Sequence, residues 1–381
     1  FGEILSDIAL ILAAAQLAKI ATTFGPAEFF ALGLFALTII GFVSGDSLIK
    51  GVIAGCMGLL LATVGMDPLE SMPRMHFGFY ELTGGLHFIA MIIGLFAISE
   101  ALIQIENSLR TTASRTVIEI SQKGDDNRVT WAEFKMVFPT MLRSAPLGIF
   151  IGAIPGIGSS IAAFLAYGMA KNMSKQPEMF GKGALEGVAA AESANNGVCG
   201  ATFIPLLTLG IPGDVITAIM LGAFMVHGLI PGPTLFTEQG GFVSAFMIGM
   251  LITSCMHLFV ALIGLRGFIQ AIKLKRSLLF PLVIVLCITG TFVAGGGQFP
   301  IYVMLGMGIL GYLMTKFGFP IPPLLIGFIL SPMIEDGLRQ ALLISDGDLA
   351  IFYGRPIAMG FLVMTAALVI WITWKHLRTQ R

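Results

Sequence analysis

Charged residues are scarce in this chain: Asp, Glu, Lys and Arg make up 12% of its 381 residues. Soluble domains contain about 25% charged residues, because a water-facing surface needs them. This deficit, together with a mean hydropathy of +0.90, excludes an ordinary soluble protein. The 22 basic and 22 acidic residues balance to a net charge of zero, so nothing indicates a nucleic-acid partner or a basic arm.

Cysteine is equally sparse. The four cysteines all lie in apolar stretches without C-x-x-C spacing: Cys56, Cys199, Cys255 and Cys287. This pattern argues against a disulfide framework or a metal centre, and it predicts small buried hydrophobic side chains.

Apolar blocks of about 17 to 22 residues are abundant, and each can cross a ~30 Å hydrocarbon layer. We expect an all-α polytopic membrane protein of about ten spans. The clearest crossings are predicted at 8–22, 27–44, 48–66, 86–104, 137–154, 242–265, 279–296, 300–315 and 357–374. The segments 155–230 and 320–345 are apolar but interrupted. With 47 glycines and 18 prolines, discontinuous or re-entrant helices are expected.

The basic residues predict the orientation. Six lie in 105–143, three in 171–186, four in 266–276 and three in the C-terminal tail, and Lys50 and Lys316 stand singly at helix ends. If the crossings alternate, these 18 of the 22 basic residues share one face. The positive-inside rule places that face in the cytoplasm.

The first interruption is the sequence GAIPGIGSS at 152–160. Pro155 removes a backbone donor and disfavours helix at the residue before it, whereas Gly156 and Gly158 permit a sharp turn. Ser159 or Ser160 is expected to cap a new helix. A turn at membrane depth must be buried in protein or line an aqueous cavity. The helix N-terminus beside it suits a carboxylate.

The second interruption has the same order of features. Asn195 and Asn196 precede an apolar run, which breaks at Pro212 and Gly213 and restarts behind Asp214 as a possible N-cap. Two such stretches are typical of a secondary transporter, whose sites lie at the unwound midpoints of discontinuous helices. Simpler explanations remain open: kinks without a ligand, asparagines that hydrogen-bond between helices, and an aspartate that only caps.

Four motifs stand out around these interruptions: GAIPGIGSSIAAFLAYG (152–168), FGKGALEGVAAAESANNG (180–197), IPLLTLGIPGDVITAIMLGA (204–223) and HGLIPGPTLF (227–236). Two further motifs lie on either side of them: FGPAEFFALGLFALT (24–38) upstream and FGFPIPPLLIGFILSP (317–332) downstream. Over nearly its whole length the chain thus resembles the large membrane subunit of the tripartite tricarboxylate transporter family.

The resemblance implies a multi-pass permease of the bacterial inner membrane, and not an enzyme. Its partners would be a small membrane subunit and a periplasmic solute-binding protein that delivers an organic carboxylate. Uptake would be coupled to Na⁺ or H⁺, with no cofactor and no ATP. The sequence lacks a Gly-rich phosphate loop ending in Lys-Ser/Thr, which agrees with this expectation.

The family has an earlier Pro-Gly break in an N-terminal repeat of inverted topology, and this chain opens after it. We therefore expect a fragment that lacks roughly the first quarter of the protein. The expected divisions are 1–104 (end of the first repeat and scaffold), 105–143 (cytoplasmic loop), 144–236 (second-repeat transport core) and 237–381 (remaining helices and cytoplasmic tail).

The site hypothesis places a di- or tricarboxylate between the tips of the discontinuous helices. Its substrate-binding residues would be Gly156, Gly158, Ser159, Ser160, Asn195, Asn196, Thr208 and Gly213. Asn195 and Asp214 would bind the coupling cation, with no catalytic residue and no resident metal. Two rival functions use related features. A channel also needs broken helices, and an intramembrane aspartyl protease needs two facing aspartates, of which the sequence offers only Asp214 at membrane depth.

Overall fold

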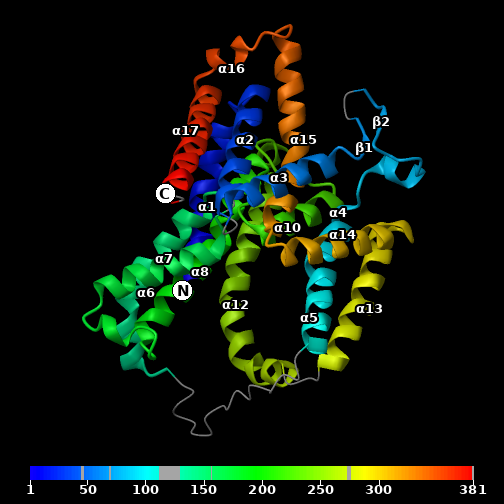
Figure 1. The fold of residues 1–381 in the computed structure, drawn as a ribbon. Helices are drawn as coiled ribbons and strands as arrows, with labels where there is room; N and C mark the ends of the chain where they lie inside the picture. Colours follow the sequence, from blue (N-terminus) through cyan, green and yellow to red (C-terminus); the bar gives the residue numbers. More distant parts are fainter. Residues whose placement is uncertain (44–46, 68–69, 111–128, 156, 273–275, 380–381) are drawn as a thin grey trace.

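The computed structural model describes residues 1–43, 47–67, 70–110, 129–155, 157–272 and 276–379. Helices dominate this part of the chain (Figure 1). Six of them are long and apolar enough to cross a membrane, and four shorter apolar helices accompany them among the described residues. The expected all-α polytopic membrane class is confirmed.

The helices follow one another along the whole sequence. They are α1 (Gly2–Ala21), α2 (Pro26–Val43), α3 (Leu48–Ala62), α4 (Phe88–Ile92), η2 (Ile93–Ile98), α5 (Ser99–Arg110), α6 (Trp131–Gly152), α7 (Gly158–Met173), α8 (Leu185–Ala201), α9 (Phe203–Leu209), α10 (Val215–Val226), α11 (Leu235–Glu238), α12 (Gly240–Ile272), α13 (Arg276–Gly295), α14 (Phe299–Lys316), α15 (Ile321–Ile344), α16 (Ala350–Gly354) and α17 (Pro356–Thr379). A short hairpin pairs β1 (Gly65–Met66) with β2 (Pro73–Arg74) before the 3₁₀ turn η1 (Tyr80–Gly84), and a second turn, η4 (Pro177–Met179), precedes α8.

Helix α8 lies between α1 on one side and α6 and α7 on the other. Small residues permit this close packing, as is usual between membrane helices. A Cβ atom added at Gly197 of α8 would lie 2.6 Å from the Ala145 carbonyl oxygen of α6. On the opposite face, a Cβ added at Gly2 would collide with the Ser193 carbonyl oxygen. The core around the second interruption is therefore built on backbone-to-backbone contact.

Helices α2, α3, α15 and α17 form a second group, which extends upward in Figure 1. Gly337 approaches the backbone of Pro26 and Phe30, and Gly33 approaches Ile334, so α2 and α15 run antiparallel. These helices contain the segments 24–38 and 317–332, each of which starts with Phe-Gly and continues with proline and an apolar run. Helices from an inverted pair of repeats are expected to run in opposite directions across the membrane.

The interruption expected at 320–345 is wrong, because α15 runs without a break from Ile321 to Ile344. Its first prolines lie in the first turn, where no backbone donor is lost from the helix. Pro332 lies inside the helix. The hydroxyl of the neighbouring Ser331 donates to the Leu59 carbonyl of α3 at 3.3 Å, so packing against α3 holds the helix at the proline.

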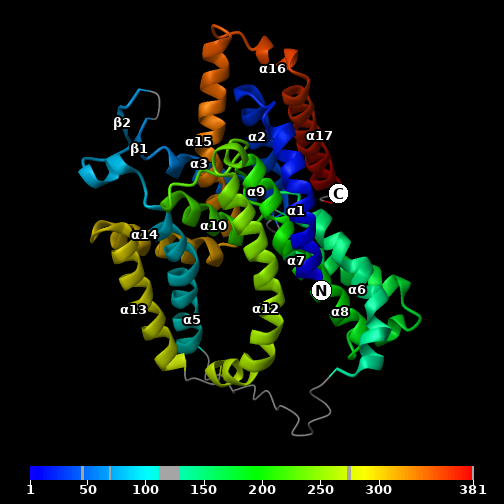
Figure 2. The ribbon, with the colours of Figure 1, turned by 180° about the vertical axis from the view of Figure 1, so that it is seen from behind.

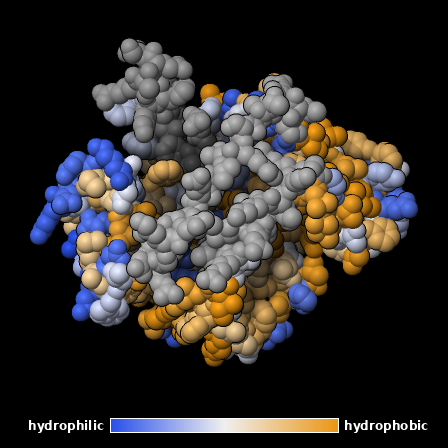
Figure 3. All heavy atoms as spheres, turned by 90° about the horizontal axis from the view of Figure 1, so that it is seen from below, coloured by the Kyte–Doolittle hydropathy of each residue, from blue (hydrophilic) through white to orange (hydrophobic). Residues whose placement is uncertain are grey.

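Helices α12 and α13 expose their apolar side chains more than any other predicted span. Only 11% of the span in α12 and 6% of that in α13 is buried within the structure. Together with α5 they point downward in Figure 1. Seen from that end, hydrophobic residues cover much of the visible periphery (Figure 3). Such surfaces suit a lipid environment, as expected of a membrane protein.

The hairpin at 65–74 marks the end of the molecule opposite the predicted cytoplasmic face. Arg74 forms an ion pair at 2.6 Å with Glu335, in the second half of α15. At the other end, the Lys50 ammonium donates to the Phe317 carbonyl at 2.7 Å, which joins the start of α3 to the end of α14. The contact of Lys50 with Phe317 joins two helix ends that the basic residues predict to lie on the same face.

Candidate functional site

The first interruption is an unwound segment between α6 and α7. Helix α6 ends at Gly152, and α7 begins at Gly158, whose φ of +76° lies in the left-handed region. Gly156 lies outside the described residues. The predicted break at Pro155 is thus present. Helix α7 then runs back along α6, because residues from Ser144 on α6 and Met173 on α7 line one pocket.

The expectation that Ser159 or Ser160 caps this helix is wrong. Helix α7 starts at Gly158, before either serine, so both serines lie in its first turn and neither is at the N-cap position. Ser159 is half-buried and Ser160 is exposed. The N-cap position is occupied by Ile157, which provides no side-chain cap in the described part of the chain. The first N–H groups of α7 therefore retain their capacity to bind an acceptor.

The second interruption separates α9 from α10. Gly210 ends α9 in the left-handed conformation (φ +73°), and its N–H donates to the Leu206 carbonyl at 2.9 Å. Asp214 caps α10: its carboxylate accepts from the Thr217 N–H at 2.8 Å, and the Thr217 hydroxyl accepts from the Asp214 N–H at 2.9 Å. The predicted break at Pro212 and the predicted cap are both confirmed.

Both interruptions meet the short junction between α8 and α9. A Cβ added at Gly152, the last residue of α6, would lie 2.9 Å from the Cβ of Ala201. A Cβ added at Gly213 would lie 2.8 Å from the Cβ of Thr202, the next residue along the chain. Two breaks separated by almost 60 residues are thus packed against neighbouring positions, as a site between discontinuous helices requires.

Helix α1 reaches the same junction through Ser6. The Ser6 hydroxyl donates to the Gly197 carbonyl at 2.5 Å and accepts from the Ala201 N–H at 2.8 Å. In a regular α-helix those two backbone groups of α8 would bond to each other. The hydroxyl is therefore inserted into the hydrogen-bond ladder, and α8 ends at this point. Figure 2 shows α1 beside α8, α9 and α12.

The remaining predicted residues lie at different distances from the junction. Asn195 and Asn196 are half-buried on α8, between one and two turns before it, and the Asn196 amide donates to the Glu192 carbonyl at 2.9 Å. Thr208 is buried on α9, and its hydroxyl donates to the Ile204 carbonyl at 2.7 Å. The substrate and cation roles of these residues stay predictions.

Two acidic residues of α1, Glu3 and Asp7, were not expected at the site. The predicted crossing started at residue 8, but α1 begins at Gly2, so Asp7 lies inside the helix and is fully buried. Its carboxylate accepts from the Ser254 hydroxyl of α12, and Glu3 pairs with His257 at 3.0 Å. The four-residue spacing of Glu3 and Asp7, which places both on one helix face, was the available signal.

Asp214 is accordingly not the only acidic residue at membrane depth. The expectation that the sequence offers an aspartyl protease only one such aspartate is therefore wrong. The two carboxylates nevertheless bond to different partners. Asp214 is engaged by Thr217 within its own helix cap, and Asp7 is engaged by Ser254 from α12. This is not the facing, mutually hydrogen-bonded pair that such a protease needs.

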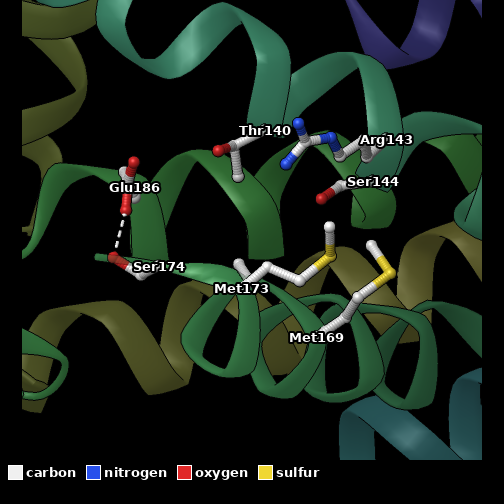
Figure 4. A pocket seen from close by; sticks show the side chains of 8 residues that line it. Thr140, Arg143, Ser144, Met169, Met173, Ser174 and Glu186 are labelled. Carbon is white, nitrogen blue, oxygen red and sulfur yellow. Dashed lines mark hydrogen bonds between the residues drawn. The ribbon is translucent and has the colours of Figure 1, made fainter. Parts of the chain in front are cut away.

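A small pocket lies between the middle of α6 and the C-terminal end of α7, away from the interruption (Figure 4). Arg143 and Ser144 line one side, Met173 the other, and Ser174 donates to Glu186 at 2.7 Å beside them. Its volume is about 40 Å³. A water molecule needs about 10–15 Å³ of such volume, so the pocket has room for about three water molecules.

Comparison with known proteins adds three findings. A family model described as the tripartite tricarboxylate transporter TctA family matches residues 1–326. A protein of Agrobacterium vitis, described as an uncharacterized 52.8 kDa protein in the TAR-I ttuC' 3'region, is 35% identical over 386 residues, which cover 100% of this chain and 75% of that protein. A second, in the TAR-II ttuC' 3'region of the same organism, is 38% identical over 61% of this chain and 97% of its own length. No solved structure matches.

Proposed function

Because the chain belongs to the TctA family of tripartite tricarboxylate transporters, we propose that it is the large membrane subunit of a cation-coupled secondary transporter. It imports a di- or tricarboxylate across the bacterial inner membrane. A solute-binding protein on the periplasmic side delivers the substrate, and a small membrane subunit completes the complex. The observation that supports this most strongly is the convergence of both helix interruptions on the α8–α9 junction.

The two new helix starts differ in what they can bind. The N-terminus of α10 is already satisfied by the Asp214 carboxylate. The N-terminus of α7 has no such cap among the described residues, so its N–H groups and the positive end of its dipole suit a substrate carboxylate. We assign the substrate to the side of Gly158, Ser159 and Ser160. Asn195 and Asn196 of α8 are the amides proposed to complete the site, with Asn196 on the side of α8 that packs against Gly2 of α1.

The coupling ion is Na⁺ or H⁺, and a site for Na⁺ belongs on the opposite side of the junction. Carbonyl groups released before Pro155 and Pro212, together with Asn195 or Asp214, are hard oxygen donors of the kind that Na⁺ prefers. Unwound carbonyls and helix C-termini bind cations in this manner in other secondary transporters. No cofactor is required, because the cation gradient supplies the free energy.

Substitution at the two interruptions tests this function. Ser159→Ala and Asn196→Ala should each abolish carboxylate uptake into cells that express the full-length transporter, while the protein is still made and inserted. Ser244→Ala is the matched control, because Ser244 is an exposed serine of α12 that bonds only within its own helix. Uptake at the normal rate in both variants would contradict the assignment, and single-channel currents would indicate a channel instead.

A further inference from the structure

Asp7 is the most deeply buried acidic group described in the structure. Its side chain has no exposed surface. Oδ2 accepts a hydrogen bond from Ser254, whereas Oδ1 has no hydrogen-bond partner among the described residues. Oδ1 points at α8, where a Cβ added at Gly200 would lie 2.6 Å from it. One hydrogen bond does not compensate an ionised carboxylate for the loss of water, so the group needs a bound cation or a proton.

The depth of the group follows from its partner on α12. At 1.5 Å per residue, Ser254 lies about 21 Å from the first residue of α12 and about 27 Å from the last. Ser254 is therefore near the middle of a helix that is long enough to cross the bilayer. An ionisable side chain at that depth marks an ion or proton path more often than a structural contact.

The groups around Asp7 leave it without a permanent positive charge. Glu3 on the same helix is the charged side chain that acts on Asp7, and Cys199 of α8 is also near Asp7. His257 of α12 is bonded to Glu3, and Asp214 of α10 is near Cys199. Helix α9 contains no titratable side chain, and Arg143 of α6 lines the pocket shared with α7. Among the described residues, no lysine or arginine forms an ion pair with Asp7.

Exposure increases step by step away from Asp7. Glu3 lies one turn nearer the start of α1, and 22% of its side chain is exposed. His257, which is bonded to Glu3, is 58% exposed. Since α1 runs parallel to α8, whose first residues follow the basic loop at 171–186, this direction leads toward the predicted cytoplasmic face. Glu3 and His257 thus form a line of protonatable groups that leads from Asp7 toward that face.

Asp7 also touches the junction where the helix interruptions meet. It packs on Gly200, the residue directly before Ala201 and Thr202, which contact the end of α6 and the second interruption. A change in the charge of this carboxyl therefore acts on the element that positions both proposed half-sites.

We propose that Asp7 is the proton-binding carboxyl of the transport cycle, and that protons are the coupling ions. This rests on the proposed transport function. The carboxylate takes up a proton when the site is open to the periplasm. It then releases that proton through the Glu3 carboxylate and the His257 imidazole to the cytoplasm. One proton therefore enters with the substrate, and the only bonds that form and break are O–H and N–H bonds.

The test uses the complete transporter in proteoliposomes. Asp7→Asn keeps the shape of the side chain and an acceptor for Ser254 but cannot bind a proton. Accumulation driven by a pH gradient should fall to the equilibrium level, while exchange of labelled for unlabelled carboxylate continues. Asp346→Asn, in an exposed loop, is the control and should behave as wild type. Ser254→Ala keeps the carboxyl and should move the pH midpoint of uptake.

Two results would overturn the proposal: accumulation by Asp7→Asn with the normal response to a pH gradient, or loss of a sodium dependence in that variant while the proton dependence persists. A second measurement does not depend on transport. The infrared C=O stretch of a protonated carboxylic acid should be present in the purified wild type and absent in Asp7→Asn. If the wild type moves no carboxylate, the proposed function fails, and this band alone decides whether Asp7 holds a proton. An unchanged band refutes the assignment.

Discussion

The contact between α6 and α8 offers the sharpest test of the fold, at Gly148. A Cβ added there would lie 2.8 Å from the carbonyl carbon of Ala194 and closer still to its oxygen. The three nearest atoms all belong to the backbone of Ala194 in α8, so no side-chain rotation can relieve the collision. Gly148→Ala must therefore push the two helices apart.

The expected magnitude follows from comparison with a glycine that meets nothing. A Cβ added at Gly249, inside α12, has no atom within 4 Å. Both alanine variants gain about 1 kcal/mol of helix propensity. Only Gly148→Ala has the cost of overpacking, typically about 1–3 kcal/mol. Because the obstacle is backbone, we expect the two variants to differ by an amount near the upper end of that range, about 3 kcal/mol.

The assay is thermal unfolding of both variants in the same detergent, followed by tryptophan fluorescence. Gly249→Ala should match or slightly exceed the wild-type midpoint, and Gly148→Ala should unfold several degrees lower. Carboxylate uptake by Gly148→Ala should also fall, because Gly152 on the same helix positions the first interruption against Ala201. Equal midpoints for the two variants would show that α6 and α8 do not pack as described, and the site built on that packing would fail with them.

Two further predictions concern the helix starts. Asp214→Ala should destabilise the protein by about 1 kcal/mol in thermal unfolding, because the cap to Thr217 is lost. Asp214→Asn retains a cap, so this variant tests the carboxylate without the loss of stability. Loss of cation-dependent uptake in Asp214→Asn would identify Asp214 as a cation ligand, whereas normal uptake would leave it as a cap only. The Thr130 N–H and hydroxyl bond to Glu133 at the start of α6, before the predicted crossing, and hold the pKa of that carboxyl below its usual value. This stabilisation is therefore present above the unfolded pKa of about 4.3 and lost as the pH falls through the lower folded value. Hydrogen exchange in the first turn of α6, corrected for its intrinsic pH dependence, should lose protection in acid in the wild type but not in Glu133→Gln, and equal behaviour of the two would contradict this.

Local chemistry explains which features could be predicted from the sequence. Pro155 and Pro212 each remove a donor whatever their surroundings, so both interruptions were predictable, as was the cap at Asp214 from a polar residue after Pro-Gly. Pro332 has the same chemistry but lies within a continuous helix. Its tolerance depends on packing against α3, which the sequence does not reveal.

The contacts at the junction were not predictable for a different reason. Ser6 bonds to Gly197 across 191 residues, and Asp7 meets Ser254 across 247. A hydropathy window places the acidic residues of α1 at the edge of a crossing, because burial of a carboxylate is unfavourable. The partners that make this burial tolerable lie far along the chain, where the window does not include them. The spacing of Glu3 and Asp7 indicates a shared face but not what that face contacts.

Three consecutive residues at the junction explain how one chain could join a proton step to a substrate step. Gly200 contacts the Asp7 carboxyl, Ala201 the end of α6, and Thr202 the second interruption. Neighbouring residues of one backbone cannot move independently, and the glycine contacts leave no spare volume into which a displacement could be absorbed. Coupling between two sites requires that each ligand favour the same arrangement of a shared element. The α8–α9 junction is that element here, which is why neutralising Asp7 should uncouple transport without abolishing exchange.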